Sequence, residues 1–215
     1  MTPEKDCPLC PRLCDFRAAN RTAYPDFHNG AVASFGSHDA ALLIVGLAPG
    51  LKGANRTARP FTGDYAGDLL YASLKRHGLS RGNYGARKDD GYELLGVRIT
   101  NAVRCVPPEN KPTPAEINTC RQFLIAEIEA MKNLRAIFTL GQIAHQSVIS
   151  TLKLKKKDHG FAHGARHEAN GLTIVASYHC SRYNTNTGVL TEAMFDAALA
   201  EAKRAAGCTD GYRLD

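Results

Sequence analysis

Residues 41–46 read Ala-Leu-Leu-Ile-Val-Gly and lead directly into a glycine-rich segment that continues to Gly67. A short, wholly apolar run that ends at glycine is typical of a strand buried on both faces of a sheet. Three further runs have the same character: Gly96-Val-Arg-Ile-Thr-Asn-Ala-Val103, Arg135-Ala-Ile-Phe-Thr-Leu140 and Leu172-Thr-Ile-Val-Ala-Ser177. The sequence therefore predicts four buried strands.

Helical patterns lie between and after these strands. Residues 68–77 have helical spacing and are closed by Gly78. The segment Thr113-Pro-Ala-Glu116 is a helix start, because threonine can cap, proline suits the first turn and glutamate can complete a capping box. Further helices are expected to begin at Gly141 and at Thr191, the latter ending at Gly207.

Strands that alternate with helices imply an α/β fold. We expect a three-layer α/β/α sandwich around a central, mainly parallel four-stranded sheet. Residues 79–96 are polar and glycine-rich, and we expect them to form a surface loop. The length of 215 residues suits one domain spanning residues 1–215.

Composition favours a globular protein with a polyanionic partner. The chain is 44% hydrophobic and 22% charged, and it has no apolar run long enough to span a membrane. The N-terminus lacks the apolar stretch of a signal peptide, so we expect a cytoplasmic protein with no membrane association. We also expect a monomer. A net charge of +6 is compatible with binding to nucleic acid phosphates.

The seven cysteines point away from a disulfide framework, because a cytoplasmic protein keeps its thiols reduced. Cys7-Pro-Leu-Cys10 is a C-x2-C pair, and Cys105 and Cys120 are two more cysteines near one strand end. Four thiolates suit zinc or an iron–sulfur cluster, although Cys105 and Cys120 could equally be core thiols. The remaining cysteines are expected to be core or surface thiols: Cys14, Cys180 and Cys208.

Polar segments follow three of the strands, at the sheet edge where open α/β folds bind ligands. The first, residues 46–64, is rich in glycine but contains neither a Walker pattern nor G-x-G-x-x-G. The second contains Thr100-Asn-Ala102, and the third reads Tyr178-His-Cys-Ser-Arg-Tyr-Asn-Thr-Asn-Thr-Gly188.

Together these segments resemble the uracil-DNA glycosylase superfamily, and they are most similar to its iron–sulfur branch, called type b or family five. The resemblance also includes residues 7–13, Cys-Pro-Leu-Cys-Pro-Arg-Leu, and the run that begins Cys105-Val-Pro-Pro-Glu-Asn-Lys-Pro-Thr-Pro and leads to Cys120. These motifs follow the family's order over roughly the whole chain. The resemblance implies a [4Fe–4S] cluster held by Cys7, Cys10, Cys105 and Cys120, which would fold the N-terminal segment, residues 1–20, onto the domain.

The resemblance also implies the catalytic groups of an enzyme that flips uracil out of DNA and hydrolyses its N-glycosidic bond. Asp64 would orient the attacking water and offset positive charge on the sugar. The related type a enzymes carry an acid where this chain has Leu47. A neutral His179 would donate a hydrogen bond to uracil O2, and Asn184 would assist catalysis or base binding.

The resemblance also implies which residues recognise the base. Asn101 has the amide donor and acceptor needed to bind the Watson–Crick edge of uracil, and Phe61 would stack on the base. The backbone around four residues would line the pocket: Gly46, Leu47, Ala48 and Gly50. Uracil-specific relatives have a bulky tyrosine at the position of Gly50, so we expect room for other damaged bases.

Contacts to DNA are expected from Arg56 and Arg59, which border the first segment, and from Ser181, Arg182 and Tyr183 in the third. Arg182 and Tyr183 are the expected wedge into the duplex. Cys180 stands where the family's His-Pro-Ser has proline. Without the fixed φ of proline, we expect the loop that carries His179 to be less rigid.

Two other functions remain open at this point. The chain could be a non-catalytic iron–sulfur protein that binds DNA on the same fold, since fold does not determine function. It could also be an α/β hydrolase stabilised by zinc, although it lacks a G-x-S-x-G segment. Base release would exclude the first alternative, and a brown protein would exclude the second.

Overall fold

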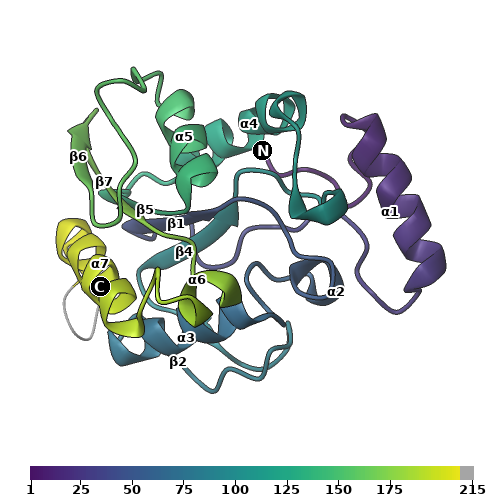
Figure 1. The fold of residues 1–215 in the computed structure, drawn as a ribbon, viewed down its shortest axis with the longest axis horizontal. Coiled ribbons are helices and arrows are strands. Elements are labelled where there is room, and N and C mark those ends of the chain that lie inside the picture. The colour runs from purple at the N-terminus through teal and green to yellow at the C-terminus, as the bar shows by residue number, and fades with distance from the viewer. Residues whose placement is uncertain (209–215) are drawn as a thin grey trace.

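A five-stranded sheet forms the centre of the computed structural model, which describes residues 1–208 (Figure 1). Its strand order is β4-β1-β5-β7-β6. The strands are β1 (Leu42–Gly46), β4 (Val97–Asn101), β5 (Ala136–Leu140), β6 (Arg166–Ala169) and β7 (Leu172–Ser177). The four predicted strands are confirmed and pair in parallel.

The prediction of only four strands is wrong, because β6 adds an antiparallel strand at the edge beside β7. Its sequence, Arg-His-Glu-Ala, has no apolar run, and its residues alternate between exposed and half-buried. An edge strand of this kind carries no signal of burial on both faces, so the sequence does not reveal it.

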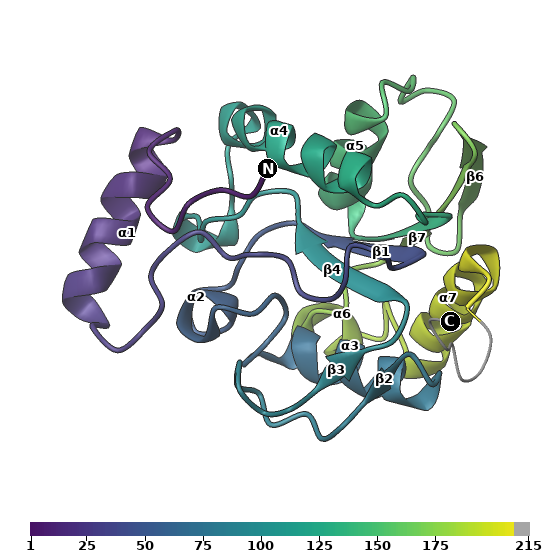
Figure 2. The ribbon, with the colours of Figure 1, turned by 180° about the vertical axis from the view of Figure 1, so that it is seen from behind.

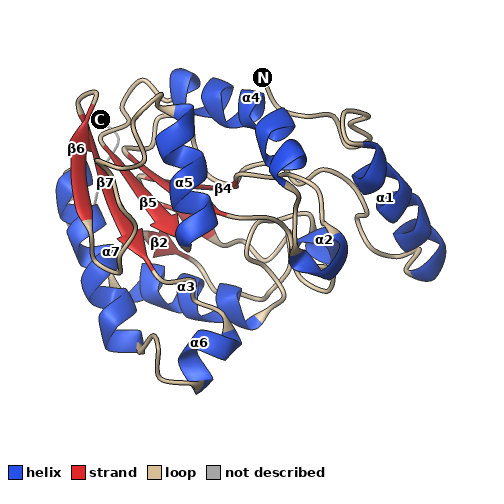
Figure 3. Ribbon diagram, turned by 45° about the horizontal axis from the view of Figure 1, so that its top comes forward, coloured by secondary structure: helices blue, strands red, loops and turns tan. Residues whose placement is uncertain are grey.

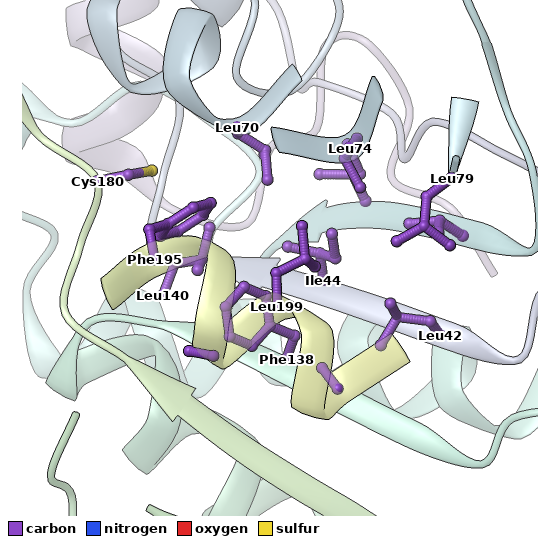
Figure 4. Packing of buried hydrophobic residues seen from close by; sticks show 14 of the residues in the cluster. Leu42, Ile44, Leu70, Leu74, Leu79, Phe138, Leu140, Cys180, Phe195 and Leu199 are labelled. Atoms are coloured by element: carbon purple, nitrogen blue, oxygen red, sulfur yellow. The ribbon is translucent and has the colours of Figure 1, made fainter. Parts of the chain in front are cut away.

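Helices cover both faces of the sheet, as predicted. On one face lie α3 (Tyr65–Arg76) and α7 (Glu192–Ala206), and on the other lie α4 (Pro114–Ala130) and α5 (Gln142–Thr151) (Figures 1 and 3). Side chains of β1 alternate between these two layers: Leu42 and Ile44 pack with α3 and α7, and Leu43 and Val45 with α4 and α5. Figure 4 shows the first of these layers.

Helix ends follow the capping signals of the sequence. Thr113 and Glu116 form the predicted capping box at the start of α4, and Gly207 ends α7 in the left-handed conformation with φ of 69°. Helix α3 begins at Tyr65, three residues before the predicted start, because the Asp64 side chain accepts a hydrogen bond from the backbone N–H of Gly67.

Residues 79–96 are more than the surface loop that the sequence predicts. They contain two short paired strands, β2 (Ser80–Arg81) and β3 (Glu93–Leu94), beside α3 (Figure 2). Tyr92 is buried, and Asp90 accepts two hydrogen bonds from Arg59, at 2.7 and 2.8 Å. The hydrogen bonds from the guanidinium hold the pKa of Asp90 far below its usual value.

The N-terminal helix α1 (Pro11–Ala23) lies at the end of the molecule opposite α7 and β6 (Figures 1 and 2). Its Leu13 packs with Val103, Cys120 and Phe123 in a third apolar cluster, separate from the two layers of the sheet. Short helical turns complete the structure: α2 (Ala54–Thr57), α6 (Arg182–Asn186) and the 3-10 turn η1 (Pro108–Asn110). No helix within residues 1–208 is both long and apolar enough to cross a membrane.

Candidate active site and thiol cluster

A cavity of about 800 Å³ opens at the carboxyl edge of the sheet, where β1, β4 and β7 end. It brings together segments that are far apart in the sequence. The predicted site residues that line it are Leu47, Ala48, Gly50, Phe61, Asp64, Asn101, His179, Ser181 and Arg182. Those that do not line it are Gly46, Arg56, Arg59, Tyr183 and Asn184.

Asp64 accepts one hydrogen bond from the backbone and lies close to a glycine of the first loop. One carboxylate oxygen, Oδ1, accepts the hydrogen bond from Gly67 at the start of α3. The other, Oδ2, lies against the backbone of the first loop, where a Cβ on Gly53 would approach it to 2.5 Å. The helix cap therefore fixes the carboxylate at the cavity wall, and the glycine leaves space for it.

Phe61 lies between two glycines. A Cβ on Gly46 would overlap the Phe61 ring, and a Cβ on Gly67 would overlap the Phe61 carbonyl oxygen. Phe61 itself has a left-handed backbone with φ of 54°, which is unusual for a residue with a bulky side chain. Gly46 thus shapes the site from behind the cavity wall, and Phe61 belongs both to the core and to the cavity.

Asn101 brings an unsatisfied polar atom to the cavity. The residue ends β4 directly beside Gly46 of β1 and is 3% exposed. Its Oδ1 is buried and has no hydrogen-bond partner among the described residues. An unpaired buried oxygen costs free energy in the absence of a ligand, so the carboxamide is suited to a donor that enters the cavity.

His179 follows β7 and faces Phe61, with 6.2 Å between the ring centroids and 30° between the planes. Burial lowers the pKa of His179 from its ordinary value of 6.5, while the charge of Asp64 acts in the opposite direction. The imidazole is therefore neutral at neutral pH, as the sequence analysis expects.

The loop after His179 is held by its side chains. Cys180 is fully buried in the core, next to the Ala66 carbonyl (Figure 4), and Ser181 caps α6. The Asn184 amide donates to the His179 carbonyl at 2.8 Å. Buried packing of Cys180 and capping by Ser181 hold the loop at this position, and the expected lower rigidity of the loop stays a prediction. Asn184 does not line the cavity, and its amide contacts the backbone of His179, which does; its predicted role in catalysis or base binding stays a prediction.

Two of the predicted DNA contacts stand at exposed positions around the cavity. Arg182 lies over the Tyr65 ring, 5.5 Å from its centroid, and Tyr183 is 74% exposed. Arg56 is exposed on α2 beside Gly63.

The prediction that Arg59 contacts DNA is wrong. It is 2% exposed, is paired with Asp90, and has its guanidinium 5.0 to 5.6 Å from three aromatic rings, those of Phe35, Tyr71 and Tyr84. It supports the fold and is not available to a phosphate.

The four predicted ligand cysteines line one small apolar cavity beneath α1: Cys7, Cys10, Cys105 and Cys120. All four are free thiols, and burial raises the pKa of Cys10 to about 11 and that of Cys105 to about 12, with neighbouring thiols adding to the effect. The Arg104 N–H donates to Cys120 Sγ at 3.4 Å. In residues 1–208, no three His, Cys, Asp or Glu side chains already stand as a metal-binding group.

A buried polar network lies beside the segment that leads from Asn101 to the thiol cavity. Glu127 of α4 accepts hydrogen bonds from Arg98 of β4, from Arg104 and from Ser34. Burial alone would raise the pKa of Glu127, but Arg104 and these hydrogen bonds hold it at about 2. Arg98 and Arg104, which precede and follow Asn101 by three residues each, are thus held by the same carboxylate.

The family model of the uracil DNA glycosylase superfamily matches residues 33–203, and the chain belongs to this superfamily. The matched segment contains every element that lines the large cavity.

Several curated relatives are similar over 94% of this chain. A type-5 uracil-DNA glycosylase of Thermus thermophilus is 43% identical, with 94% of its own length covered. The proteins of the same name from Mycobacterium leprae and Pyrobaculum aerophilum are 42% and 38% identical, with 92% and 90% of their lengths covered. A type-4 uracil-DNA glycosylase of Thermotoga maritima is 36% identical over 65% of this chain.

Part of the cavity wall could not be predicted from the sequence. Lys52, Gly53, Tyr65 and Asn110 line it as well. Asn110 comes from η1, between Cys105 and α4, and no strand end or glycine-rich run marks it. The sequence feature that could have identified Asn110 is its position in the motif between Cys105 and Cys120. That motif was interpreted as a metal-binding segment only.

Removal of the Asp64 charge is expected to lower the pKa of His179 further. Asp64→Asn takes away the charge that favours the imidazolium, while the burial that disfavours it stays. A histidine NMR titration measures the shift. His163, whose pKa is also lowered by burial but without a contribution from Asp64, is the internal control and should not move. A His179 pKa above 6.5, or one unchanged by the substitution, contradicts this electrostatic account.

Proposed function

We propose that this protein excises uracil from DNA by hydrolysing the N-glycosidic bond, leaving an abasic site. The observation that carries the proposal is the arrangement of Asn101, Asp64 and His179 around one cavity, with the Asn101 oxygen unpaired. Membership of the superfamily and the type-5 relatives support the same activity. DNA is therefore the substrate, and uracil is the base that we assign to the cavity.

Recognition of uracil rests on Asn101. Uracil presents an N3–H donor beside the O4 acceptor, and a carboxamide offers the complementary acceptor and donor. Cytosine presents the reverse pattern, with an acceptor at N3 and a donor at N4, so a carboxamide held in the orientation that suits uracil would not pair with it. The Phe61 ring supplies a face on which the extruded base stacks.

In the reaction, the bond between C1′ of the sugar and N1 of uracil breaks, and its electron pair leaves with the base. Asp64 holds the water that attacks C1′ and offsets the positive charge that develops on the sugar. The neutral His179 donates a hydrogen bond to uracil O2 as the base gains negative charge. Asn184 fixes the backbone of His179 and acts as a positioning residue.

The substrate range is proposed to extend beyond uracil. Gly50 lines the cavity without a side chain, and a Cβ there would meet only the Asp64 carboxylate, at 3.2 Å. The wall therefore leaves space that a bulky residue would fill. Other deaminated or damaged bases fit this proposal.

We further propose that Cys7, Cys10, Cys105 and Cys120 hold a [4Fe–4S] cluster. The donor set supports it: four free thiols surround one apolar cavity, and a backbone N–H already points to one sulfur. Such a cluster would have a structural role, tying α1 to the end of β4 and to α4. Zinc is the alternative occupant that the four thiols admit.

We also propose that the protein acts as a monomer in the cytoplasm. All the groups assigned to recognition and chemistry come from one chain, and seven free thiols suit a reducing compartment.

The test of the proposed activity is base release from an oligonucleotide that carries one uracil. The unaltered protein should release uracil, and Asp64→Asn and His179→Ala should each reduce the rate by about 10²- to 10⁴-fold, the range for loss of one group of this kind. Lys132→Ala, at an exposed position that does not line the cavity, is the control and should release uracil at the unaltered rate. Binding of the oligonucleotide without any release would instead support a non-catalytic DNA-binding protein.

The cluster has its own test. The purified protein should be brown with absorbance at about 400 nm, and Cys105→Ser should lower iron content and solubility together. Cys14→Ser is the matched control, because Cys14 lies one helical turn from Cys10 but does not line the thiol cavity. A colourless, zinc-containing protein would replace the cluster with zinc, and a folded, soluble Cys105→Ser variant would contradict the structural role.

A further inference from the structure

We propose that His163 is a positioning residue for the reaction: its imidazole accepts a hydrogen bond from the Tyr178 N–H and so fixes the peptide that carries His179. This inference rests on the proposed function and adds to it a residue outside the cavity. His163 lies in the turn before β6 and does not line the large cavity. Its effect on the reaction therefore passes through the backbone that leads to His179.

The imidazole of His163 continues the pairing of β6 with β7 where the backbone turns away at Gly164, whose φ is 75°. Just before β6, the Ala176 N–H donates to the Ala165 carbonyl at 2.9 Å, and the Gly164 N–H donates to the Ala176 carbonyl at 2.8 Å. Two residues further along the chain, the Tyr178 N–H donates to Nδ1 of His163 at 3.3 Å. A side-chain nitrogen thus takes the place of the backbone carbonyl that would follow in a regular antiparallel ladder.

The ring accepts this hydrogen bond only in its neutral form, with the proton on Nε2. Burial lowers the pKa of His163 from its ordinary value of 6.5, while a backbone hydrogen bond to Met194 of α7 acts in the opposite direction. The neutral form is therefore the one present at neutral pH. The Ser177 hydroxyl, 3.4 Å from the same Nδ1, donates to the Tyr178 carbonyl at 2.9 Å, which leaves Nδ1 to the Tyr178 N–H.

His179 is held on both sides by this arrangement. After it in the chain, the Asn184 amide donates to the His179 carbonyl, and before it, His163 binds the Tyr178 N–H. The pairing of β7 with β5 ends at Ser177, and within residues 1–208 Nδ1 of His163 is the one acceptor of the Tyr178 N–H. Loss of this acceptor would free the peptide on one side, so the imidazole of His179 would no longer be held where the base leaves.

The experiment compares His163→Leu with His163→Asn in release of uracil from DNA. The two new side chains have nearly the same shape, but only asparagine places an acceptor, Oδ1, near the position of Nδ1. We expect His163→Leu to lower kcat about tenfold with KM nearly unchanged, because His179 acts in the transition state. His163→Asn should stay within about twofold of the unaltered protein. An equal loss of kcat in both variants overturns the proposal.

His167→Leu separates positioning from a purely structural role. His167 is half-buried on β6 and contacts the Gly160 carbonyl at 2.9 Å, so its loss also weakens the hairpin but leaves the Tyr178 N–H paired. Both leucine variants should melt at a lower temperature, and only His163→Leu should lower kcat. Equal kcat values of the two leucine variants overturn the proposal.

A double variant tests whether the effect passes through His179. In a His179→Ala background, His163→Leu should cost nothing further, because no imidazole is left to position. A loss that persists without His179 overturns the proposal. His163→Gln takes the place of His163→Leu if the latter does not fold, since it keeps a polar side chain but carries its amide one bond further out. It should show the same loss of kcat, and an unaltered kcat overturns the proposal.

NMR distinguishes failure of this inference from failure of the proposed function. If the unaltered protein releases no uracil, the glycosylase proposal fails, and hydrogen exchange of the Tyr178 amide together with the His179 imidazole signals decides the role of His163. Faster exchange and shifted His179 signals in His163→Leu, but not in His163→Asn, support the positioning role. Unchanged exchange or unchanged His179 signals in His163→Leu overturn it.

Discussion

The site depends on the close approach of Phe61 to the bare backbone of Gly46. The ring occupies the space that a side chain on Gly46 would fill, and the Phe61 carbonyl uses the space left by Gly67. Because Gly46 also lies beside Asn101 in the sheet, one missing side chain lets the ring and the carboxamide meet at the same wall. The N–H of Gly67 also donates to Asp64. The Phe61 ring, the Asn101 carboxamide and the Asp64 carboxylate are therefore all positioned by the same packing around two glycines.

The site also depends on the segment of chain that continues from the end of β4. Asn101 ends this strand, and Cys105 follows four residues later, with the Glu127 network supporting both. The thiol cavity, the turn at Asn110 and the inner wall of the large cavity are thus consecutive on one stretch of chain. A group bound by the four thiols would stabilise the site through this stretch without contact with the substrate, which agrees with the structural role proposed for it.

Much of the fold and of the candidate site could be predicted from the sequence, because the patterns that indicate them lie within short segments of the chain. Apolar runs gave the four parallel strands, and Thr113 and Gly207 gave helix ends. The motifs placed Asp64, Asn101 and His179 together. What could not be predicted depends on contacts distant in sequence: the polar edge strand β6, the burial of Arg59 against Asp90, and the packing of Cys180 in the core. The places of Asn110 at the cavity and of Asn184 beside it belong here too, because a side chain's direction depends on the loop around it.

The most direct measurement of the central constraint is base release by Gly46→Ala, with far-ultraviolet circular dichroism and thermal melting to confirm that the sheet forms. The added methyl group stands in the place of the Phe61 ring and 2.5 Å from Asn101 Oδ1, so both must move. Displacement of reacting groups by about 1 Å costs roughly a hundredfold in rate. The account predicts a folded protein with uracil release reduced by about that factor. A folded variant that releases uracil at the unaltered rate would contradict it.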